Sequence, residues 1–258
     1  CSSDLIVTAT SVASPSEWAD ATVTVPDAAV YQPGILWTRQ FGTGGRDEAR
    51  GVAVDAPSGR IYVVGSTTGS LANAGSALED VFVRAIDSDG TALWTRQFGS
   101  SGQDFGWDVA VAPDGTVVVA ARLNGAGVVR KFEDDGSDAW THTITDMSDA
   151  YDVSVDPTGH ILVSGSTRGS LASPNAGEED AFVRKLDADG AEVWTRQYGD
   201  AGWDVALDVA VDAQGNVAVV GSTEISDYGE TNVLVWMMDA DGNELWDRSF
   251  GSGDRSEE

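Results

Sequence analysis

A tryptophan-centred motif recurs along the chain, and this repeat constrains the fold more than any other feature. The segment LWTRQFG at 36–42 returns unchanged at 93–99 and as VWTRQYG at 193–199. Weaker copies begin at Trp140 and Trp246. Successive tryptophans of the five copies are 46 to 57 residues apart. A period of roughly 50 residues is typical of one β-propeller blade or a similar four-stranded unit.

Each interval between tryptophans divides in the same way. In the first interval, a loop rich in Gly and Asp precedes the short apolar segment Val52–Val54, and a Pro- and Gly-containing turn leads to Ile61–Val64. A variable loop then leads to Val81–Arg84, and an acidic turn returns the chain to the next Trp segment. Four β-rich segments joined mostly by short turns predict an antiparallel meander. Such a unit cannot bury its faces alone, so we expect neighbouring units to pack face to face around an axis.

The same segments carry a resemblance to a known family. The run WTRQFG, GVAVD, IYVVGSTTGSL and DVFVRAIDSDG resembles the bacterial SBBP repeats, and the resemblance extends over about residues 36 to 251. It implies a β-propeller fold and an extracellular setting, and it implies no reaction. The predicted fold class is therefore all-β, a propeller of four-stranded antiparallel blades.

The number of blades depends on the first residues. Residues 47 to 250 form four complete repeats, and two β-like segments, Asp4–Ala9 and Ala21–Val25, come earlier. We predict five blades, with these segments as inner strands of a degenerate N-terminal blade. In the alternative, residues 1–30 form a tether, or an edge that pairs with another subunit, because an unpaired edge strand favours association. The domain prediction is accordingly 1–30 for this segment and 31–258 for the propeller.

Composition excludes several classes of protein. The chain carries 42 acidic against 15 basic side chains, a net charge of -27, yet 41% of it is hydrophobic. That apolar fraction is sufficient for a folded core at this length. The negative charge would repel phosphate backbones and anionic lipid surfaces, so nucleic-acid binding is not expected. No apolar run approaches the length of a transmembrane helix.

The single cysteine is the first residue of the chain, so no internal disulfide is expected. Cys1 followed by two serines resembles a mature bacterial or archaeal lipoprotein, in which this cysteine carries lipid. The resemblance implies lipid attachment at Cys1, membrane contact only through that lipid, and a location at the cell surface, outer membrane or periplasm. The alternative is a sequence that happens to begin at this cysteine.

Catalytic motifs are nearly absent from the sequence. There is no GxSxG elbow, P-loop or dinucleotide fingerprint, and the two histidines, His142 and His160, lie in different structural settings. Paired carboxylates are abundant, so acid and base hydrolysis stays open. We therefore predict a non-enzymatic binding or scaffold protein. The alternatives are a structural subunit of a surface assembly or filament, and a carboxylate-dependent hydrolase.

The Asp-x-Asp-Gly turn is the most regular polar feature. Calcium prefers clustered oxygen ligands, and this triplet opens many calcium loops. None of the copies continues with the further ligands of a complete loop, and Asp and Gly are also what a tight hairpin requires. The hairpin role is favoured, and calcium is the one cofactor that these turns suggest. The candidate ligands are Asp87, Asp89, Asp187, Asp189, Asp239 and Asp241.

Candidate recognition residues lie in the loop that leads to the first strand of a repeat. Aromatic residues that break the repeat are better candidates for recognition than the repeated tryptophans, and an acid that precedes the strand could attract cations or cap its own loop. Capping is favoured for the acids. The candidates are Trp107, Trp203 and Tyr151, with Asp47, Asp104 and Asp204; Asp149 is one residue out of register with these acids.

The longest loops connect the second and third strands of three repeats, at 66–79, 166–179 and 222–230. In a meander blade these loops share one face with the connections between blades. We therefore expect a protein or glycan partner to bind on this long-loop face, with homo- or hetero-assembly as a further expectation.

Overall fold

The computed structural model describes residues 6–10, 20–24, 36–72, 78–146, 148–224 and 230–251. The chain divides into two compact units, Cys1–Gly106 and Trp107–Glu258. Every described element is a β-strand, and no helix in these ranges is long and apolar enough to cross a membrane. Cys1 lies outside the described residues.

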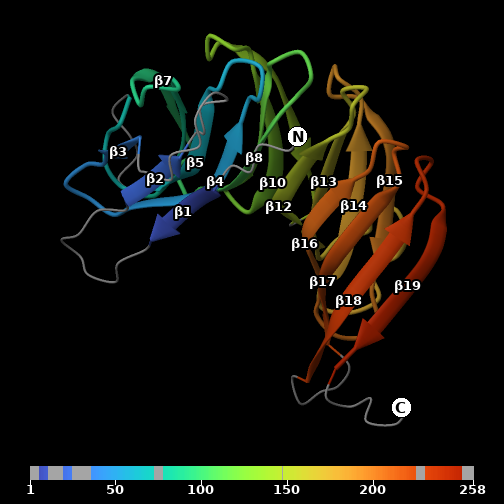
Figure 1. The fold of residues 1–258 in the computed structure, drawn as a ribbon. Helices are drawn as coiled ribbons and strands as arrows, with labels where there is room; N and C mark the ends of the chain where they lie inside the picture. The colour runs from blue at the N-terminus through green and yellow to red at the C-terminus, as the bar shows by residue number, and fades with distance from the viewer. Residues whose placement is uncertain are drawn as a thin grey trace. The chain divides into compact units, whose positions relative to one another are not determined.

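Unit 1 contains two antiparallel sheets (Figure 1). A three-stranded sheet has the order β1-β2-β3, and a four-stranded sheet has the order β4-β5-β6-β7. The strands are β1 (Ile6–Thr10), β2 (Asp20–Thr24), β3 (Trp37–Gln40), β4 (Asp47–Val54), β5 (Ile61–Thr67), β6 (Asp80–Ile86) and β7 (Ala92–Phe98).

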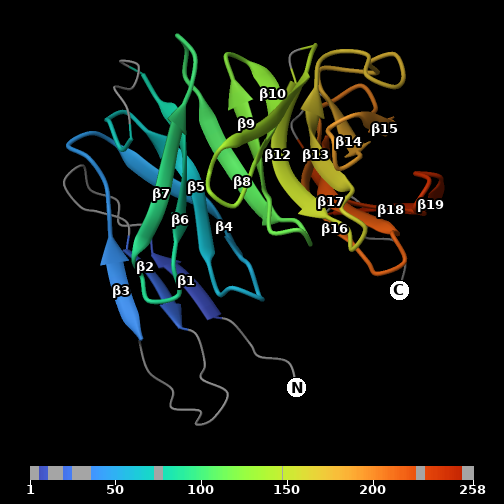
Figure 2. The same cartoon turned by 90° about the horizontal axis from the view of Figure 1, so that it is seen from above.

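Unit 2 contains three four-stranded antiparallel sheets, which run from green to red in Figure 2. The first begins with the last two residues of unit 1. Its strands are β8 (Phe105–Val111), β9 (Val117–Leu123), β10 (Ala126–Phe132) and β11 (Asp138–Ile144). The second has β12 (Ser148–Val155), β13 (Ile161–Thr167), β14 (Asp180–Leu186) and β15 (Glu192–Tyr198). The third has β16 (Asp204–Val211), β17 (Val217–Glu224), β18 (Thr231–Met238) and β19 (Glu244–Phe250).

The prediction of an all-β chain built from four-stranded antiparallel meanders is confirmed, because each complete repeat forms one such sheet. The early β segments predicted at 4–9 and 21–25 correspond to β1 and β2. They join the Trp37 strand in a sheet of three strands rather than four. The prediction of five blades is not confirmed.

The second and third strands of a sheet carry most of the core. All seven residues of β5, β13 and β14 are buried, without the polar alternation of a sheet that has one wet face. Strands covered on both faces have this composition. In unit 2, side chains of β13 and β14 pack directly against β16, β17 and β18.

The first strand of three sheets contains a β-bulge, and the glycine opposite it explains part of the repeat. In β12 the register shifts between Ala150 and Asp152, opposite Gly165 and Ser164 of β13. A Cβ at Gly165 would lie 1.8 Å from the Asp149 carbonyl oxygen. Only glycine permits this approach, so the recurrent Gly-Ser-Thr triplet includes a backbone requirement.

The repeated tryptophan of one sheet binds the acidic turn of the next, and we call this contact the latch. Trp194 Nε1 donates to the Ala240 carbonyl at 3.2 Å, and its ring covers Gly242, where a Cβ would lie 2.9 Å from the indole. Trp140 makes the same contact with Ala188 and Gly190. In unit 1, Trp37 makes it with Ser88 and Gly90. Trp and turn are therefore the two halves of one inter-sheet contact.

The residue two positions after each Trp completes this latch. Arg39 Nε and Arg196 Nε donate to the carbonyls of Gly90 and Gly242, at 3.2 and 2.6 Å. His142 Nδ1 lies 3.1 Å from the Gly190 carbonyl in the corresponding contact. The Trp-Thr-Arg motif and the Asp-x-Asp-Gly motif therefore recur together because they bind one another.

Carboxyls on the first strands link neighbouring sheets of unit 2. Asp108 Oδ2 accepts from the Val153 N–H at 3.3 Å, and Asp152 Oδ2 accepts from the Val209 N–H at 2.9 Å. The two carboxyls also interact with each other. Burial first, and then the Asp108 carboxyl, raises the pKa of Asp152 to about 8. Burial likewise raises the pKa of Asp108.

The latch predicts unequal costs for two glycine substitutions. Gly242 and Gly115 both have positive φ, +74° and +83°, so Ala at either position costs about 1 kcal/mol in backbone energy. A Cβ at Gly115 meets no atom within 4 Å, whereas at Gly242 it meets the Trp194 ring. Urea denaturation should therefore show Gly242→Ala to be more destabilising than Gly115→Ala by about 1 kcal/mol or more. Equal losses would contradict the latch.

The carboxyl link predicts a pH dependence of stability. In the unfolded chain the pKa of Asp152 is about 3.9, so the folded protein binds the carboxyl proton of Asp152 more tightly. The stabilisation from the proton is complete below the unfolded pKa and is lost as the pH rises towards 8. Asp152→Asn keeps an acceptor for the Val209 N–H and should flatten the decline of unfolding free energy between pH 4 and 8. Asp212→Asn is the control, because the Asn216 side chain lowers the Asp212 pKa and its titration lies below this range.

Candidate functional site

A connected group of polar and aromatic side chains lies in unit 2, where three sheets contribute residues. Asp149 and Tyr151 come from β12, and Arg122 comes from β9 of the preceding sheet. Ser166 lies near the end of β13, and Glu179 directly precedes β14. Arg168 follows β13, and Trp203 precedes β16. We refer to these seven residues as the carboxylate cluster.

The centre of the carboxylate cluster is Asp149, whose side chain is 18% exposed. Arg122 Nε lies 3.1 Å from Asp149 Oδ1, and the Tyr151 hydroxyl lies 3.4 Å from Oδ2. Burial raises the pKa of the Asp149 carboxyl, Arg122 opposes this shift, and the Glu179 charge adds to it. Asp149 is therefore a carboxyl that holds its proton to higher pH than an exposed aspartate.

Tyr151 connects Asp149 to the aromatic part of the site. Its ring meets Trp107 of β8 edge to face, with centroids 5.4 Å apart. Burial raises the pKa of Tyr151, and the nearby Asp149 and Glu179 charges raise it further, whereas a hydrogen bond with Ser166 lowers it. Tyr151 therefore stays a neutral hydroxyl that can donate a hydrogen bond.

Glu179 is the second carboxyl of the cluster and is held by two side chains. Its Oε1 accepts from Arg168 Nε at 2.9 Å, and its Oε2 accepts from the Ser166 hydroxyl at 2.8 Å. Its side chain is 13% exposed. The cluster thus places a carboxyl with a raised pKa near a carboxyl bound by an arginine, an arrangement typical of acid and base chemistry.

Trp203 forms the exposed edge of the cluster. The Arg168 guanidinium lies over its ring at 5.1 Å from the centroid. Its backbone is fixed by Glu224, whose N–H donates to the Trp203 carbonyl and whose carboxylate accepts from the Trp203 N–H. The residue is 42% exposed. An aromatic face held in place while open to solvent can support a ligand ring.

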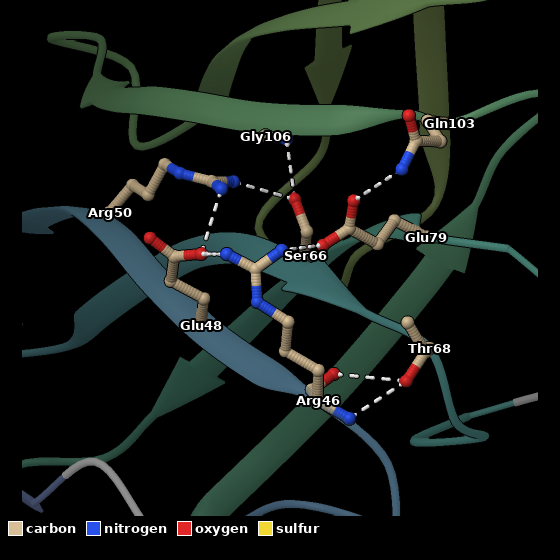
Figure 3. Close-up of polar contacts among 8 residues, drawn as sticks. All are labelled: Arg46, Glu48, Arg50, Ser66, Thr68, Glu79, Gln103 and Gly106. Atoms are coloured by element: carbon tan, nitrogen blue, oxygen red, sulfur yellow. Dashed lines mark hydrogen bonds and ion pairs between the residues drawn. The ribbon is translucent and has the colours of Figure 1, made fainter. Parts of the chain in front are cut away.

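Unit 1 has a related cluster at the corresponding repeat positions (Figure 3). Glu79, which is buried, takes the place of Glu179 and binds Arg46 and Gln103. Ser66 takes the place of Ser166, and accepts from Arg50 Nη1 at 2.7 Å and from the Gly106 N–H at 3.4 Å.

The unit 1 cluster differs from that of unit 2 in its aromatic residues and its second acid. Arg50 stands where Tyr151 stands in unit 2, and Gln103, directly before Asp104, stands where Trp203 stands directly before Asp204. Glu48, in the place of Asp149, is ion-paired with both arginines. Two arginines bind Glu48 where one binds Asp149, so the unit 2 cluster is the stronger candidate for acid catalysis.

The acids predicted before the first strands act on their own loops. Asp47 Oδ2 accepts from the Thr43 N–H at 2.6 Å, and Asp204 Oδ2 accepts from the Asp200 N–H at 2.8 Å. Asp104 accepts from the backbone N–H and hydroxyl of Ser100. Asp104 and Asp204 are fully buried. These contacts correspond to the capping role that the sequence favours.

The predicted aromatic residues occupy two different places. Trp107 and Tyr151 lie within first strands, at matching positions, because these strands begin several residues earlier than the apolar triplets suggest. Trp203 alone lies in the connection before its strand. Tyr151 and Trp203 both belong to the carboxylate cluster, and Trp107 packs against Tyr151.

The Asp-x-Asp-Gly carboxylates are engaged with turn backbone. Asp87 accepts from Ser88 N–H and Asp89 from Thr91 N–H. Within unit 2, Asp187 and Asp239 each accept from two N–H groups of their own turns, one of them on the second Asp of the motif, Asp189 or Asp241. Over the described ranges, no group of three or more His, Cys, Asp or Glu side chains is arranged to hold a metal ion. Calcium binding stays a prediction.

Sequence reasoning missed Glu179, Ser166, Arg168 and Arg122. The first two belong to the repeated Gly-Ser-Thr and Glu-Asp segments and therefore resemble scaffold. Arg122 could have been found, because it replaces the serine of that triplet in the repeat whose loop is shortest. Asp149 carried a similar signal, since it falls one residue from the position of the capping acids.

Comparison with solved structures identifies proteins of similar fold. The periplasmic gluconolactonase PpgL of Pseudomonas aeruginosa matches with a TM-score of 0.55 and 13% identity, over 90% of this chain and 64% of that one. A structure described as a candidate gluconolactonase gives a TM-score of 0.45 and 14% identity over 89% and 72%. Sqt1 from Chaetomium thermophilum gives 0.46 and 12% over 89% and 64%. This chain thus spans less than two thirds of PpgL and of Sqt1. No curated protein matches the chain.

The comparison with PpgL corrects the prediction of a non-enzymatic binding or scaffold protein, which is wrong. PpgL is described as an enzyme and shares the fold of this chain, so neither the repeat nor the lack of a linear motif argues against catalysis. The carboxyls of the carboxylate cluster lie on separate strands and loops, so no contiguous sequence motif reports this candidate site. The likeness to PpgL itself shows the fold alone.

The family model of the SBBP beta-propeller repeat matches residues 36–72, from the first Trp strand to the loop after β5. This segment contains the first half of the latch and the Gly-Ser-Thr triplet that faces the bulge. Residues 36–72 are therefore an SBBP beta-propeller repeat, as the recurring Trp strands predict.

Proposed function

We propose that this protein is a carboxylate-dependent hydrolase whose site is the carboxylate cluster of unit 2. The observation that carries the proposal is the pairing of unlike carboxyls. Burial raises the pKa of Asp149, whereas Arg168 and the Ser166 hydroxyl both donate to Glu179. Two carboxyls in such unlike environments would supply a general acid and a general base in one site.

The roles follow from these environments. Asp149 would donate its proton to the leaving oxygen of the substrate, and Glu179 would accept a proton from the attacking water. The Tyr151 hydroxyl and the Arg122 guanidinium contact Asp149 and set its orientation and its pKa. The water oxygen would bond to the substrate carbon as the C–O bond to the leaving oxygen breaks, with the Asp149 proton going to that oxygen and one water proton to Glu179.

The substrate class that we propose is a carbohydrate ester, lactone or glycoside. Trp203 presents an exposed ring against Arg168, which binds Glu179, and aromatic faces suit the apolar face of a sugar ring. PpgL, described as a gluconolactonase, makes a sugar lactone a reasonable first substrate to assay. A glycan on the long-loop face would be bound as this substrate.

The cellular location, the lipid anchor, calcium binding, assembly and the blade count are further proposals. We propose a lipid-anchored protein at the cell surface, outer membrane or periplasm, attached through Cys1. Calcium at the Asp-x-Asp-Gly turns, assembly with other chains, and a count of five blades with the β1–β3 sheet as the degenerate one are predictions that mass spectrometry, calcium titration and sedimentation would test.

Substitution of the proposed acid should abolish hydrolysis. Asp149→Asn removes the transferable proton and keeps the size of the side chain, so kcat on a lactone or chromogenic glycoside should fall about 100-fold or more. The wild-type rate should decline as the pH rises through the Asp149 pKa, because the acid acts only while protonated. Arg122→Gln should move this decline to higher pH, since Arg122 lowers the Asp149 pKa.

Asp212→Asn is the matched control for this experiment, because Asp212 lies in an exposed turn outside the cluster. It should leave the rate and its pH profile unchanged. Wild-type-like turnover by a folded Asp149→Asn variant would exclude Asp149 as the acid, and inactivity of the wild type on all three substrate classes would exclude the proposed chemistry.

Removal of the exposed ring should affect substrate binding more than stability. Trp203→Ala should raise KM several-fold with little change in kcat, because the ring supports the substrate and transfers no proton. Its unfolding free energy should change by less than about 1 kcal/mol, as is usual for exposed sites. Trp246→Ala is a matched control, since Trp246 is 43% exposed on β19. A large loss of stability in Trp203→Ala alone would indicate a structural role.

A further inference from the structure

The Trp half of the inter-sheet latch recurs on the last strand of unit 2. Trp246 of β19 pairs with Met237 across the sheet, as Trp194 of β15 pairs with Lys185. Trp194 is 8% exposed because the turn at 239–242 covers it, whereas Trp246 is 43% exposed. Within the described residues of unit 2, the sheet β16–β19 therefore carries a latch residue without the turn that covers its equivalent.

The whole outward face of this sheet corresponds to the face by which its predecessor packs. On β14 and β15, the pairs Val183–Arg196 and Ala181–Tyr198 face the sheet β16–β19. The corresponding pairs on β18 and β19 are Val235–Arg248 and Val233–Phe250. Ala181 is fully buried, whereas Val233 and Phe250 are 45% and 52% exposed. An apolar surface of this kind typically marks an interface.

Arg248 is already oriented like the arginines of the complete latches. Its Nη1 donates to the Asp247 carbonyl at 2.7 Å, as Arg196 Nη1 donates to the Thr195 carbonyl at 2.9 Å. In Arg196 this contact leaves Nε and Nη2 to donate to Gly242 and Asp241 of the next sheet. The guanidinium of Arg248 is thus positioned for two further carbonyls.

The first strand repeats the pattern. Asp108 and Asp152 each accept from a backbone N–H on the first strand of the following sheet. Asp208 occupies the corresponding position on β16, directly before Val209 and after the bulge, and is exposed. It provides a carboxylate for one more N–H of the same kind.

We propose that the outward face of sheet β16–β19 docks a further blade of the same repeat, one that carries an Asp-x-Asp-Gly turn. Trp246 would cover the glycine of that turn, Arg248 would bind the carbonyls of the turn, and Asp208 would accept from the first strand of the blade. The apolar side chains Val220, Val233 and Phe250 would pack against its second and third strands.

The chemistry of the latch selects this occupant over others. The Asp-x-Asp-Gly turns at 87–90, 187–190 and 239–242 already hold Trp37, Trp140 and Trp194, so a second copy would offer these turns only by giving up a latch. The segment 25–36, which joins β2 to β3, contains no Asp-x-Asp-Gly sequence. The chain's own N-terminal sheet therefore lacks the motif.

The test extends the full chain by a second copy of residues 199–250 placed after Phe250. All tryptophans are labelled with 5-fluorotryptophan, and the fluorine resonance of Trp246 is assigned by its loss in Trp246→Phe. In the original chain this resonance should shift between H2O and D2O, because the ring is solvated. In the extended chain the solvent shift should fall at least by half, and the added copy should resist proteolysis.

The control is the extended chain in which the copied Gly242 is replaced by valine, whose side chain blocks the indole. Trp246 should then remain solvated. A second variant, Trp246→Ala in the extended chain, should leave the added copy open to proteolysis while the original sheets stay resistant.

Three results would overturn the proposal. The first is a Trp246 that stays solvated in the extended chain, whether or not the copy is cut. The second is a Trp246 already protected in the original chain while sedimentation shows a monomer, which would assign the face to the N-terminal sheet. The third is the same protection in a dimer, which would assign it to a second copy.

Discussion

The structure depends on a contact between a tryptophan and a glycine on different sheets. The indole ring can cover the turn only because the residue beneath it has no Cβ, and the turn needs that glycine for its positive φ as well. One residue thus satisfies a local and a long-range requirement. The only two lysines of the chain, Lys131 and Lys185, serve the same contact, since each donates to the turn carbonyl that accepts from the Trp.

Because each repeated residue type has a fixed structural role, the fold can be predicted from the sequence. The Trp segments, the apolar segments and the Asp-x-Asp-Gly turns occur in a fixed order, and each has one physical role, so periodicity alone predicts the sheets and their connections. The first strands were harder to delimit. Their bulges, as at Ala150 and Asp152, interrupt the alternation that marks a strand, so their early residues resemble loop in the sequence.

The site was predictable only where it departs from the repeat. Tyr151 and Trp203 were found because aromatic residues stand there in some repeats and not in others. Glu179 was not, because the same Glu-Asp pair also occurs in unit 1, and what distinguishes it is its set of neighbours. Contacts such as Arg168 with Trp203 join residues 35 positions apart, and no spacing in the sequence reports them.

The latch has a consequence for a chain with a net charge of -27. Its Trp, Arg and Lys donors bind backbone carbonyls, and most of the acidic groups take no part in it. Dissolved ions screen attraction between exposed charges strongly, whereas they weaken hydrogen bonds to neutral carbonyls far less. The latch hydrogen bonds that join neighbouring sheets therefore depend little on ionic strength. The screening of the acidic surface can change with the salt concentration without weakening them.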